Sequence, residues 1–332
     1  MSYTIQPYDE ALQYILDEGV VKSNKRTGIK TKYVPGILSR YDLTESFPLV
    51  TRRKIWPKSI WAELLWFISG STNNNDLNEL GAKIWNPWVD EEFEQKHGYA
   101  SGAFGPVYGF QLRHFGGYYG NGIGGATGSD KDHVTESDFC QAGHPVWDDT
   151  KESASKIPDS MLVNLKDKPN VYGAGGFDQL DWIVNRLKED SSCRRMLFSL
   201  WNPQETHRMK LPPCHYTYQV MVDDDGMLTG SLTQRSCDFP IGVPANIQFY
   251  SALTIMLAQQ SGFTAKEFVH YTVDSHIYWD QIPAIEEYLS LPTFDCPSLT
   301  INKAESIYDY KLEDFQFSDY ECGPKLTIPV AV

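Results

Sequence analysis

The hydrophobic and polar positions of this chain follow a helical period in four segments. Residues 7–20 and 177–187 each carry one apolar stripe with polar residues between, which predicts two amphipathic helices. Residues 57–69 are apolar on most sides and begin with proline, which predicts a mostly buried helix with that proline in its first turn. Residues 244–260 are apolar nearly all round, so we expect a helix in the middle of a domain.

Other segments show the alternation of β-strands. Residues 195–201 are predicted to form a strand, hydrophobic from Met196 to Trp201, and residues 214–222 alternate with tyrosine and valine on one face. The turn sequence Asp223-Asp-Asp-Gly226 predicts a hairpin in which residues 227–233 pair back on the strand before it. Strands and helices are mixed without strict βαβ alternation, so we predict an α+β fold.

A polar stretch interrupts this pattern. Residues 116–128 hold seven glycines, but neither a preceding strand nor a lysine at the required position makes them a nucleotide-binding loop. Residues 129–170 are polar and acidic without a clear period. We therefore predict a single domain over residues 1–332, with an insertion at about 117–174 that forms a surface loop.

Composition and charge limit the class of protein. The chain has 332 residues, of which 41% are hydrophobic and 22% charged, as in soluble globular proteins. The sequence contains no run of eighteen apolar residues, so we predict no membrane span. Residues 1–16 lack the pattern of a signal peptide. The net charge of −14 opposes binding to DNA, whose phosphates need a basic surface. Six widely spaced cysteines without a CxxC pair favour a reducing cytoplasm and predict no metal site.

Candidate chemistry gathers at the predicted hairpin. Leu211-Pro-Pro-Cys-His215 precedes its first strand, and Gln234-Arg-Ser-Cys-Asp238 ends its second. The hairpin places Cys214 and Arg235 at the same end, where the guanidinium would favour the reactive thiolate. The alternative is a buried structural cysteine. A catalytic pair of Cys214 with His215 is disfavoured, because neighbouring residues on a strand point to opposite faces.

Glu63 stands out within the apolar helix of residues 57–69. An ionised carboxylate among tryptophan and leucine side chains is costly unless it is paired or hydrogen-bonded, which suggests a functional role. The alternative is that Glu63 lies on a solvated face of the helix.

Motifs along nearly the whole chain, except the insertion, resemble those of the thymidylate synthase family and occur in the family's order. They are Arg26-Thr-Gly, Phe47-Pro-Leu-Val-Thr51, Glu63-Leu-Leu-Trp-Phe, Lys83-Ile-Trp85, Gly105-Pro-Val-Tyr-Gly109, Asp178-Gln-Leu180, Arg194-Arg195, Trp201-Asn202-Pro203, Leu211-Pro-Pro-Cys-His215, Gln234-Arg-Ser-Cys-Asp238, Gly242-Val-Pro-Ala-Asn246, Asp274-Ser-His-Ile-Tyr278 and Pro329-Val-Ala-Val332.

The resemblance implies a fold, a reaction and an assembly. The fold would be a large, mixed, mostly antiparallel β-sheet covered by helices, with one sheet face forming the interface of a homodimer with shared active sites. The reaction would convert dUMP to dTMP with 5,10-methylenetetrahydrofolate, without a metal. Cys214 would attack C6 of the uracil ring and make C5 nucleophilic.

The resemblance also assigns residues to the nucleotide. Arg26, Arg235 and Ser236 would hold the phosphate, joined by Arg194 and Arg195 of the partner subunit; arginine suits this task because its planar fork matches phosphate oxygens. Asn246 would read the uracil edge. The remaining assignments are His276 and Tyr278 for the sugar hydroxyl, Glu63 and His215 for protons near O4, and Tyr108 for the water that removes the C5 proton.

On the folate side, the resemblance implies contacts from Phe67, Trp85, Asp238, Ile241, Gly242 and Val332. This chain departs from the family pattern on or near that side: Ala245 replaces a usual phenylalanine, Leu112 a tryptophan, Asn86 an aspartate, and Gln248-Phe249 a small pair. These departures leave open a dUMP or dCMP hydroxymethylase that uses the same cysteine and folate with water in place of hydride. A non-catalytic nucleotide-binding homologue is a further alternative.

Overall fold

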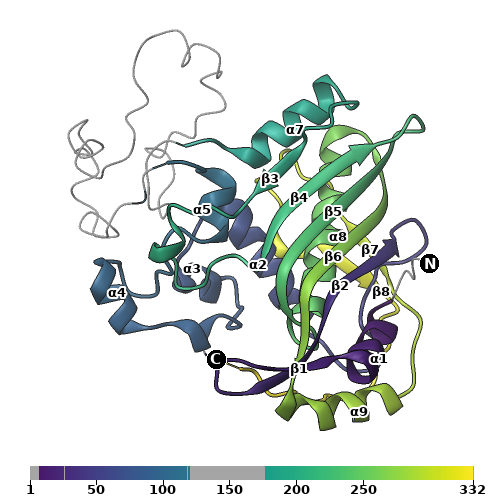
Figure 1. Ribbon diagram of the computed structural model, residues 1–332. Helices are drawn as coiled ribbons and strands as arrows, with labels where there is room; N and C mark the ends of the chain where they lie inside the picture. Colours follow the sequence, from purple (N-terminus) through teal and green to yellow (C-terminus); the bar gives the residue numbers. More distant parts are fainter. Residues whose placement is uncertain (1–6, 26, 118, 120–175, 332) are drawn as a thin grey trace. The chain divides into compact units, whose positions relative to one another are not determined.

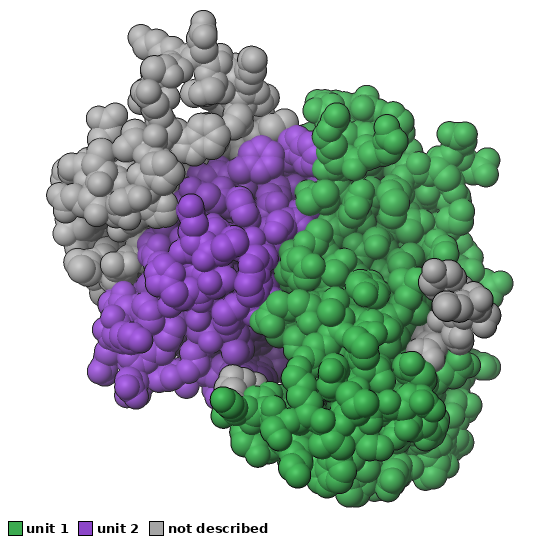
Figure 2. Space-filling model, viewed as in Figure 1, with its two compact units in different colours: residues 1–65, 184–197, 214–332 green, residues 66–183, 198–213 purple. Residues whose placement is uncertain are grey.

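The computed structural model describes residues 7–25, 27–117, 119 and 176–331. The chain divides into two compact units, shown in different colours in Figure 2. Unit 1 comprises residues 1–65, 184–197 and 214–332, and unit 2 comprises residues 66–183 and 198–213. Arg26, Val332 and nearly all of the predicted insertion lie outside the described residues.

A six-stranded sheet in the order β1-β2-β6-β5-β4-β3 forms the centre of unit 1 (Figure 1). The β5–β6 pair is parallel, whereas β1–β2, β2–β6 and β4–β5 are antiparallel. The predicted α+β fold with a mixed, mostly antiparallel sheet is therefore confirmed. The strands are β1 (Val20–Ser23), β2 (Lys30–Asp42), β3 (Leu197–Ser199), β4 (His215–Val222), β5 (Met227–Asp238) and β6 (Thr264–Tyr278).

Several strands differ from the sequence prediction, which did not anticipate β1, β2 or β6. The strand expected over residues 195–201 is shorter in the structure and spans only Leu197–Ser199. The long strand β2 was not anticipated, since Pro35 and Gly36 in its middle are typical of a turn. In the structure Gly36 takes a left-handed φ of 83°, and Tyr271 of β6 lies so close that an added Cβ would meet its hydroxyl at 3.1 Å. Glycine is needed there because any side chain would be both strained and crowded.

Three helices of unit 1 are α1 (Tyr8–Glu18), α8 (Gly242–Ser261) and α9 (Ile282–Ser290). Helix α8 packs on β5 and β6, and α1 packs on β2 and β6. α8 and the residues just before it are long and apolar enough to cross a membrane, but 72% of that window is buried, as expected for a core helix. The helix ends at Gly262, whose left-handed φ of 82° suits its C-cap position.

The two faces of this sheet are unlike. Because paired residues share a face, the register places Ser39, His270 and Leu232 together on the face that α8 covers, where all three are buried. The next pair, Leu38 and Tyr271, points to the other face, where their side chains stay 39% and 42% exposed. The sheet thus has one packed face and one face with exposed apolar side chains.

The rest of unit 1 packs through aromatic residues. Strands β7 (Ser298–Ile301) and β8 (Phe315–Ser318) form a second, antiparallel pair, and the short helices η6 (Trp279–Gln281) and η7 (Leu312–Asp314) precede α9 and β8. Trp61, from the part of α2 (Pro57–Ser69) in this unit, is buried and stacks on Phe315 with ring centroids 5.1 Å apart. The predicted helix over residues 57–69 has these bounds.

Unit 2 contains short helices joined by buried polar contacts. Arg113 donates to Asp178 at 2.7 Å, and both side chains are almost fully buried. Such a pair compensates two charges that would be very costly apart. The elements are α3 (Asn74–Glu79), η1 (Asn86–Trp88), α4 (Glu91–His97), α5 (Tyr108–Arg113), η5 (Thr206–Arg208) and the start of α7 (Gln179–Glu189), the last being the helix predicted over residues 177–187.

Candidate active site

The hairpin of β4 and β5 brings Cys214 beside Arg235. The backbone N–H of Arg235 donates to the Cys214 carbonyl at 2.8 Å, and the guanidinium Nη2 lies 3.8 Å from Sγ. Cys214 and Arg235 meet because the strand register pairs His215 with Gln234. The turn sequence at residues 223–226 predicts this meeting. A half-buried sulfur next to a fixed cation is suited to carry negative charge and act as a nucleophile.

His215, the next residue along the chain, contacts the core helix α8. Its Nδ1 lies 2.6 Å from the hydroxyl of Tyr250 on α8, and the ring is buried. Burial, with a smaller contribution from His270, lowers the pKa of His215 to about 3. The imidazole is therefore neutral at physiological pH and available for hydrogen bonding.

A buried amide network fixes the orientation of Asn246. The Asn246 Nδ2 donates to Gln234 Oε1 at 2.9 Å, and His270 Nε2 lies 2.9 Å from the same oxygen. An amide oxygen can only accept, so His270 carries its proton on Nε2; burial lowers its pKa to about 3, which keeps the ring neutral. The free edge of Asn246 thus offers one N–H and its oxygen. Sequence reasoning assigned no role to Gln234 or His270, although Gln234 lies within a family motif.

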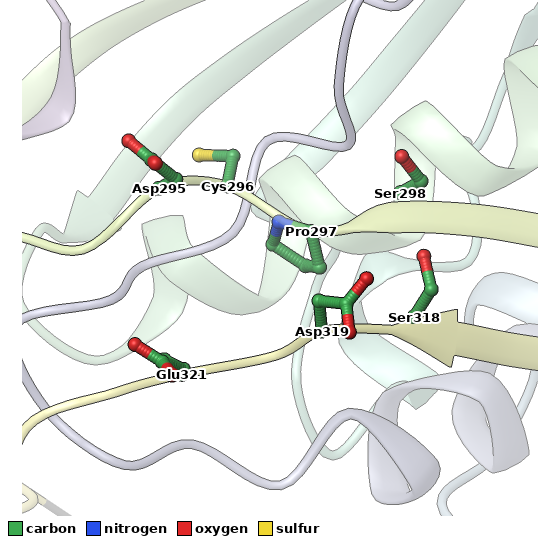
Figure 3. Close-up of a pocket in the computed structure, with 7 residues that line it drawn as sticks. All are labelled: Asp295, Cys296, Pro297, Ser298, Ser318, Asp319 and Glu321. Atoms are coloured by element: carbon green, nitrogen blue, oxygen red, sulfur yellow. The ribbon is translucent and has the colours of Figure 1, made fainter.

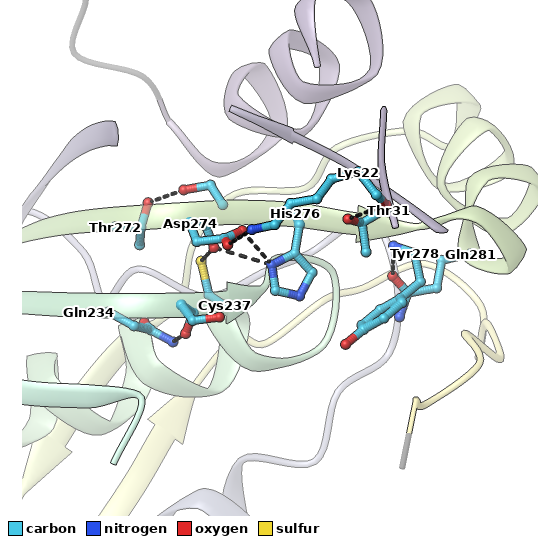
Figure 4. A network of polar contacts seen from close by, with 11 residues as sticks. Lys22, Thr31, Gln234, Cys237, Thr272, Asp274, His276, Tyr278 and Gln281 are labelled. Atoms are coloured by element: carbon cyan, nitrogen blue, oxygen red, sulfur yellow. Dashed lines mark hydrogen bonds and ion pairs between the residues drawn. The ribbon is translucent and has the colours of Figure 1, made fainter. Parts of the chain in front are cut away.

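The sugar-binding candidates lie at the end of β6 (Figure 4). The Asp274 carboxylate accepts from His276 Nδ1 at 3.1 Å and from Lys22 Nζ at 2.6 Å. The hydrogen bond from His276, helped by Lys22, lowers the pKa of Asp274 to about 2. Because Nδ1 faces two oxygens of Asp274, it carries a proton, which leaves Nε2 as the ring nitrogen for a sugar hydroxyl. The ring of Tyr278 meets His276 edge-on at 5.1 Å.

Asp238 is the candidate group for the folate in unit 1. Burial raises the pKa of its carboxyl to about 6, and Gln281 Nε2 donates to both oxygens at 3.1 and 2.9 Å. A half-buried carboxylate with spare lone pairs suits the adjacent N–H donors of a pterin ring. Open space lies nearby, because a Cβ added to Gly242 would meet only Asn246 Nδ2, at 3.9 Å. Asp238, Gly242 and the half-buried Ile241 therefore fit such a group.

Three further candidates lie together in an aromatic cluster of unit 2. Phe67 stacks on Tyr108 with centroids 4.8 Å apart, and Trp85 meets Tyr108 edge-on at 5.7 Å. Trp66 and Phe104 complete the cluster, at 5.7 and 5.2 Å from Trp85. All five rings are buried, so their positions are set by packing.

The other candidates have simpler surroundings. Glu63 lies on α2 and is only half-buried, so its carboxylate is more exposed to solvent than its apolar neighbours in the sequence suggest. Arg194 and Arg195 are exposed just before β3, and Ser236 is half-buried opposite Asp274 in the sheet. Among the described residues, no cluster of His, Cys, Asp or Glu could hold a metal ion.

A hollow of about 340 Å³ near β7 and β8 does not belong to this constellation (Figure 3). Its lining includes Asp295, Asp319 and Glu321 and carries no basic residue. Three carboxylates would repel a phosphate, so the hollow is unsuited to a nucleotide.

Comparison with known proteins agrees with these features. The family model for thymidylate synthase matches residues 6–332. The chain is 36% identical to a thymidylate synthase of Coxiella burnetii (strain Dugway 5J108-111) and 33% identical to one of Malacoplasma penetrans (strain HF-2), covering 99% of this chain and all of each relative. It is also 33% identical to the bifunctional dihydrofolate reductase-thymidylate synthase of Paramecium tetraurelia, of which it spans 61%. The chain belongs to the thymidylate synthase family.

Proposed function

We propose that this enzyme converts dUMP to dTMP with 5,10-methylenetetrahydrofolate as one-carbon donor and reductant. The observation that carries the proposal is the contact of the Arg235 guanidinium with the Cys214 sulfur at the end of a hairpin that also positions Asn246. The family relatives are named thymidylate synthases, which supports the same reaction.

Cys214 is the proposed nucleophile. Its thiolate adds to C6 of uracil, which places electron density on C5, where the new carbon–carbon bond forms. Arg235 stabilises the sulfur charge and, with Ser236 and Arg26, holds the phosphate of the nucleotide. The folate supplies the methylene carbon and the hydride that completes the methyl group, and the C6–sulfur bond breaks as the hydride is delivered, which frees the Cys214 thiolate.

Asn246 is the proposed reader of the base. One of its N–H groups is held by Gln234, so the second can donate to O4 while the side-chain oxygen accepts from N3–H. His276 Nε2 accepts from the 3′-hydroxyl, and the hydroxyl of Tyr278 binds the same group. Cytosine presents the opposite hydrogen-bonding pattern and is disfavoured.

Proton transfers are assigned to three residues. Glu63 and neutral His215 serve the O4 side of the ring through ordered water, and Tyr108 positions the water that takes the C5 proton. The neutral state of His215 fits a hydrogen-bonding role in which it orients water without taking up the proton itself, because its lowered pKa disfavours the protonated ring.

The folate contacts are proposed from each unit separately. In unit 1, Asp238 pairs with the pterin ring, Ile241 and Gly242 line its space, and the C-terminal Val332 closes over it. In unit 2, Trp85 and Phe67 are proposed to offer aromatic surface to folate. Ala245, in place of an aromatic residue, leaves a gap that would admit water, which is the feature that favours the hydroxymethylase alternative.

The open sheet face is the proposed interface of a homodimer. Leu38, Tyr271, Val273 and Met221 expose apolar surface there, and an isologous contact with a second copy would bury it. Arg194 and Arg195 are exposed and could then reach the phosphate site of the partner. Mixing Arg195→Ala with Cys214→Ala subunits should restore activity, and no recovery after subunit exchange would exclude shared sites.

The whole chain is proposed to act as one catalytic domain in the cytoplasm, since the family match spans both units. The deciding assay supplies dUMP and methylenetetrahydrofolate and follows dihydrofolate by absorbance and the nucleotide by mass. Equal amounts of dTMP and dihydrofolate support the synthase. Hydroxymethyl-dUMP with tetrahydrofolate would establish the hydroxymethylase, and nucleotide binding without turnover would establish a non-catalytic homologue.

A further inference from the structure

Gln281 is a fully buried amide that connects three parts of unit 1. It is the last residue of η6, and its Oε1 accepts the backbone N–H of Tyr278 at 3.0 Å. Its Nε2 donates to the two oxygens of Asp238, and also to the carbonyl of Pro329 at 2.9 Å. Figure 4 shows Gln281 beside Tyr278 at the end of β6.

Both N–H groups of this side chain are used. A primary amide has two N–H groups, so one serves the two carboxylate oxygens of Asp238 and the other serves Pro329. The bond from Tyr278 fixes which end of the amide carries the nitrogen. If the C-terminal segment moved away, a buried N–H would lose its acceptor, which is unfavourable.

We propose that Gln281 is a positioning residue that latches the C-terminal segment 329–331 in place and aims the carboxylate of Asp238. The same amide performs both tasks, so the placement of the segment and the orientation of the carboxylate are coupled. The latch stands on the hydrogen bonds alone, whereas its effect on folate rests on the proposed function.

The charges around Asp238 make the coupling measurable. Burial raises the pKa of this carboxyl, and the hydrogen bond from Gln281 opposes that rise, followed by His276 and the N–H of Ile241; Asp280 acts in the same direction as burial. Without the Gln281 donor, the carboxyl should keep its proton to a higher pH. A residue that only filled space would leave this titration unchanged.

The first experiment tests the latch in the ligand-free full-length protein. Lys325 is exposed, and trypsin cleavage after it releases residues 326–332, which mass spectrometry can follow. In Gln281→Met, which keeps the side-chain length and removes the donors, release should be roughly tenfold faster, as the loss of one buried hydrogen bond implies. Gln281→Leu also removes both donors without adding a carboxyl group beside Asp238, so it should behave alike and serves if the methionine variant fails to fold.

Gln260→Met is the matched control. Gln260 is also a buried glutamine of unit 1 whose amide donates to a backbone carbonyl, that of Ala304, at 3.0 Å. Its substitution should not accelerate release of the C-terminal peptide. Wild-type release rates in both Gln281 variants would overturn the latch, whether or not the enzyme makes dTMP.

The second experiment tests the coupling to Asp238. Gln281→Met should raise the KM for methylenetetrahydrofolate by roughly tenfold, weaken dUMP binding less than that through Tyr278, and move the acidic limb of the kcat/KM profile to higher pH. In a protein that lacks residues 329–332, Gln281→Met should change the KM less than it does in the full chain, because both changes remove the hydrogen bond between Gln281 and Pro329. Full additivity, or an unchanged pH profile, would overturn the coupling; a wild-type enzyme that makes no dTMP would instead overturn the proposed function.

Discussion

The nucleotide candidates of unit 1 and the aromatic cluster of unit 2 are positioned by different forces. In unit 1, Asn246 of α8 and His276 of β6 are each aimed by a hydrogen-bonded partner, Gln234 and Asp274. In unit 2, Trp85 and Tyr108 are held by ring packing around Trp66. Hydrogen bonds have direction and modest net energy, whereas packing has little direction and large energy. We therefore expect changes in the first region to alter chemistry and specificity, and changes in the second to alter stability.

The largest effect is expected for Cys214→Ala. Loss of the covalent route should lower turnover by roughly 10⁴-fold or more, while dUMP still binds, because the amide and phosphate contacts remain. Steady-state kinetics and calorimetric titration would measure the two. Cys296→Ala, at an exposed cysteine, is the control and should keep normal turnover. More than a tenth of wild-type turnover in the Cys214 variant would show that this cysteine is not the nucleophile.

The aromatic cluster should respond through stability. Trp66→Ala removes a buried ring and should lower the free energy of unfolding by about 3–5 kcal/mol. Trp56→Ala is the control, since Trp56 is 59% exposed and contacts Lys54 at the surface; its cost should stay within about 1 kcal/mol. Denaturant unfolding curves would compare them. Equal losses in the two variants would contradict the view that packing holds this cluster.

Asn246→Asp should change specificity more than stability. A protonated carboxyl matches the amino group and bare N3 of cytosine. The ratio of kcat/KM for dCMP to kcat/KM for dUMP should therefore rise by a factor that corresponds to about 2–3 kcal/mol. The variant should unfold near the wild-type temperature, because Gln234 keeps a partner in His270. An unchanged ratio would show that another group reads the base.

The smallest effect is expected at the Asp274 pair and depends on pH. The folded-state pKa of Asp274, about 2, lies below its unfolded value, so this carboxylate stabilises the fold above the unfolded pKa and loses that contribution as pH falls toward 2. After allowance for partial solvent screening, Asp274→Asn should cost about 1 kcal/mol at pH 7 and progressively less below pH 4. Asp223→Asn, which breaks the exposed pair with Lys266, is the control and should change stability less. A cost independent of pH would show that ionisation is not involved.

The sequence was sufficient for features with local causes. Helical periodicity predicted α1, α2, α7 and α8, and the turn at residues 223–226 predicted that Cys214 and Arg235 meet. Contacts between distant residues could not be inferred in this way. Gln281 reaches Pro329, and Gln234 reaches His270, only because the folded sheet brings them together. Strand β2 was missed for a related reason. Pro35-Gly36 looks like a turn in the sequence, but the pairing of β2 with the distant strand β6 continues on both sides of it.

The pairing of β2 with β6 also sets the order in which the sheet can form during synthesis. Asp42 pairs with Glu267 and Thr31 with Tyr278, so β2 leaves the ribosome long before its main partner exists. At the usual 5–20 residues per second, β2 waits roughly 10–50 s with only the short β1 beside it. During that time Val34 and Ile37, which are buried in the finished sheet, are exposed on a strand with an open edge. Newly made chains should therefore be most prone to aggregation, and most dependent on chaperones, until residues beyond 278 have emerged.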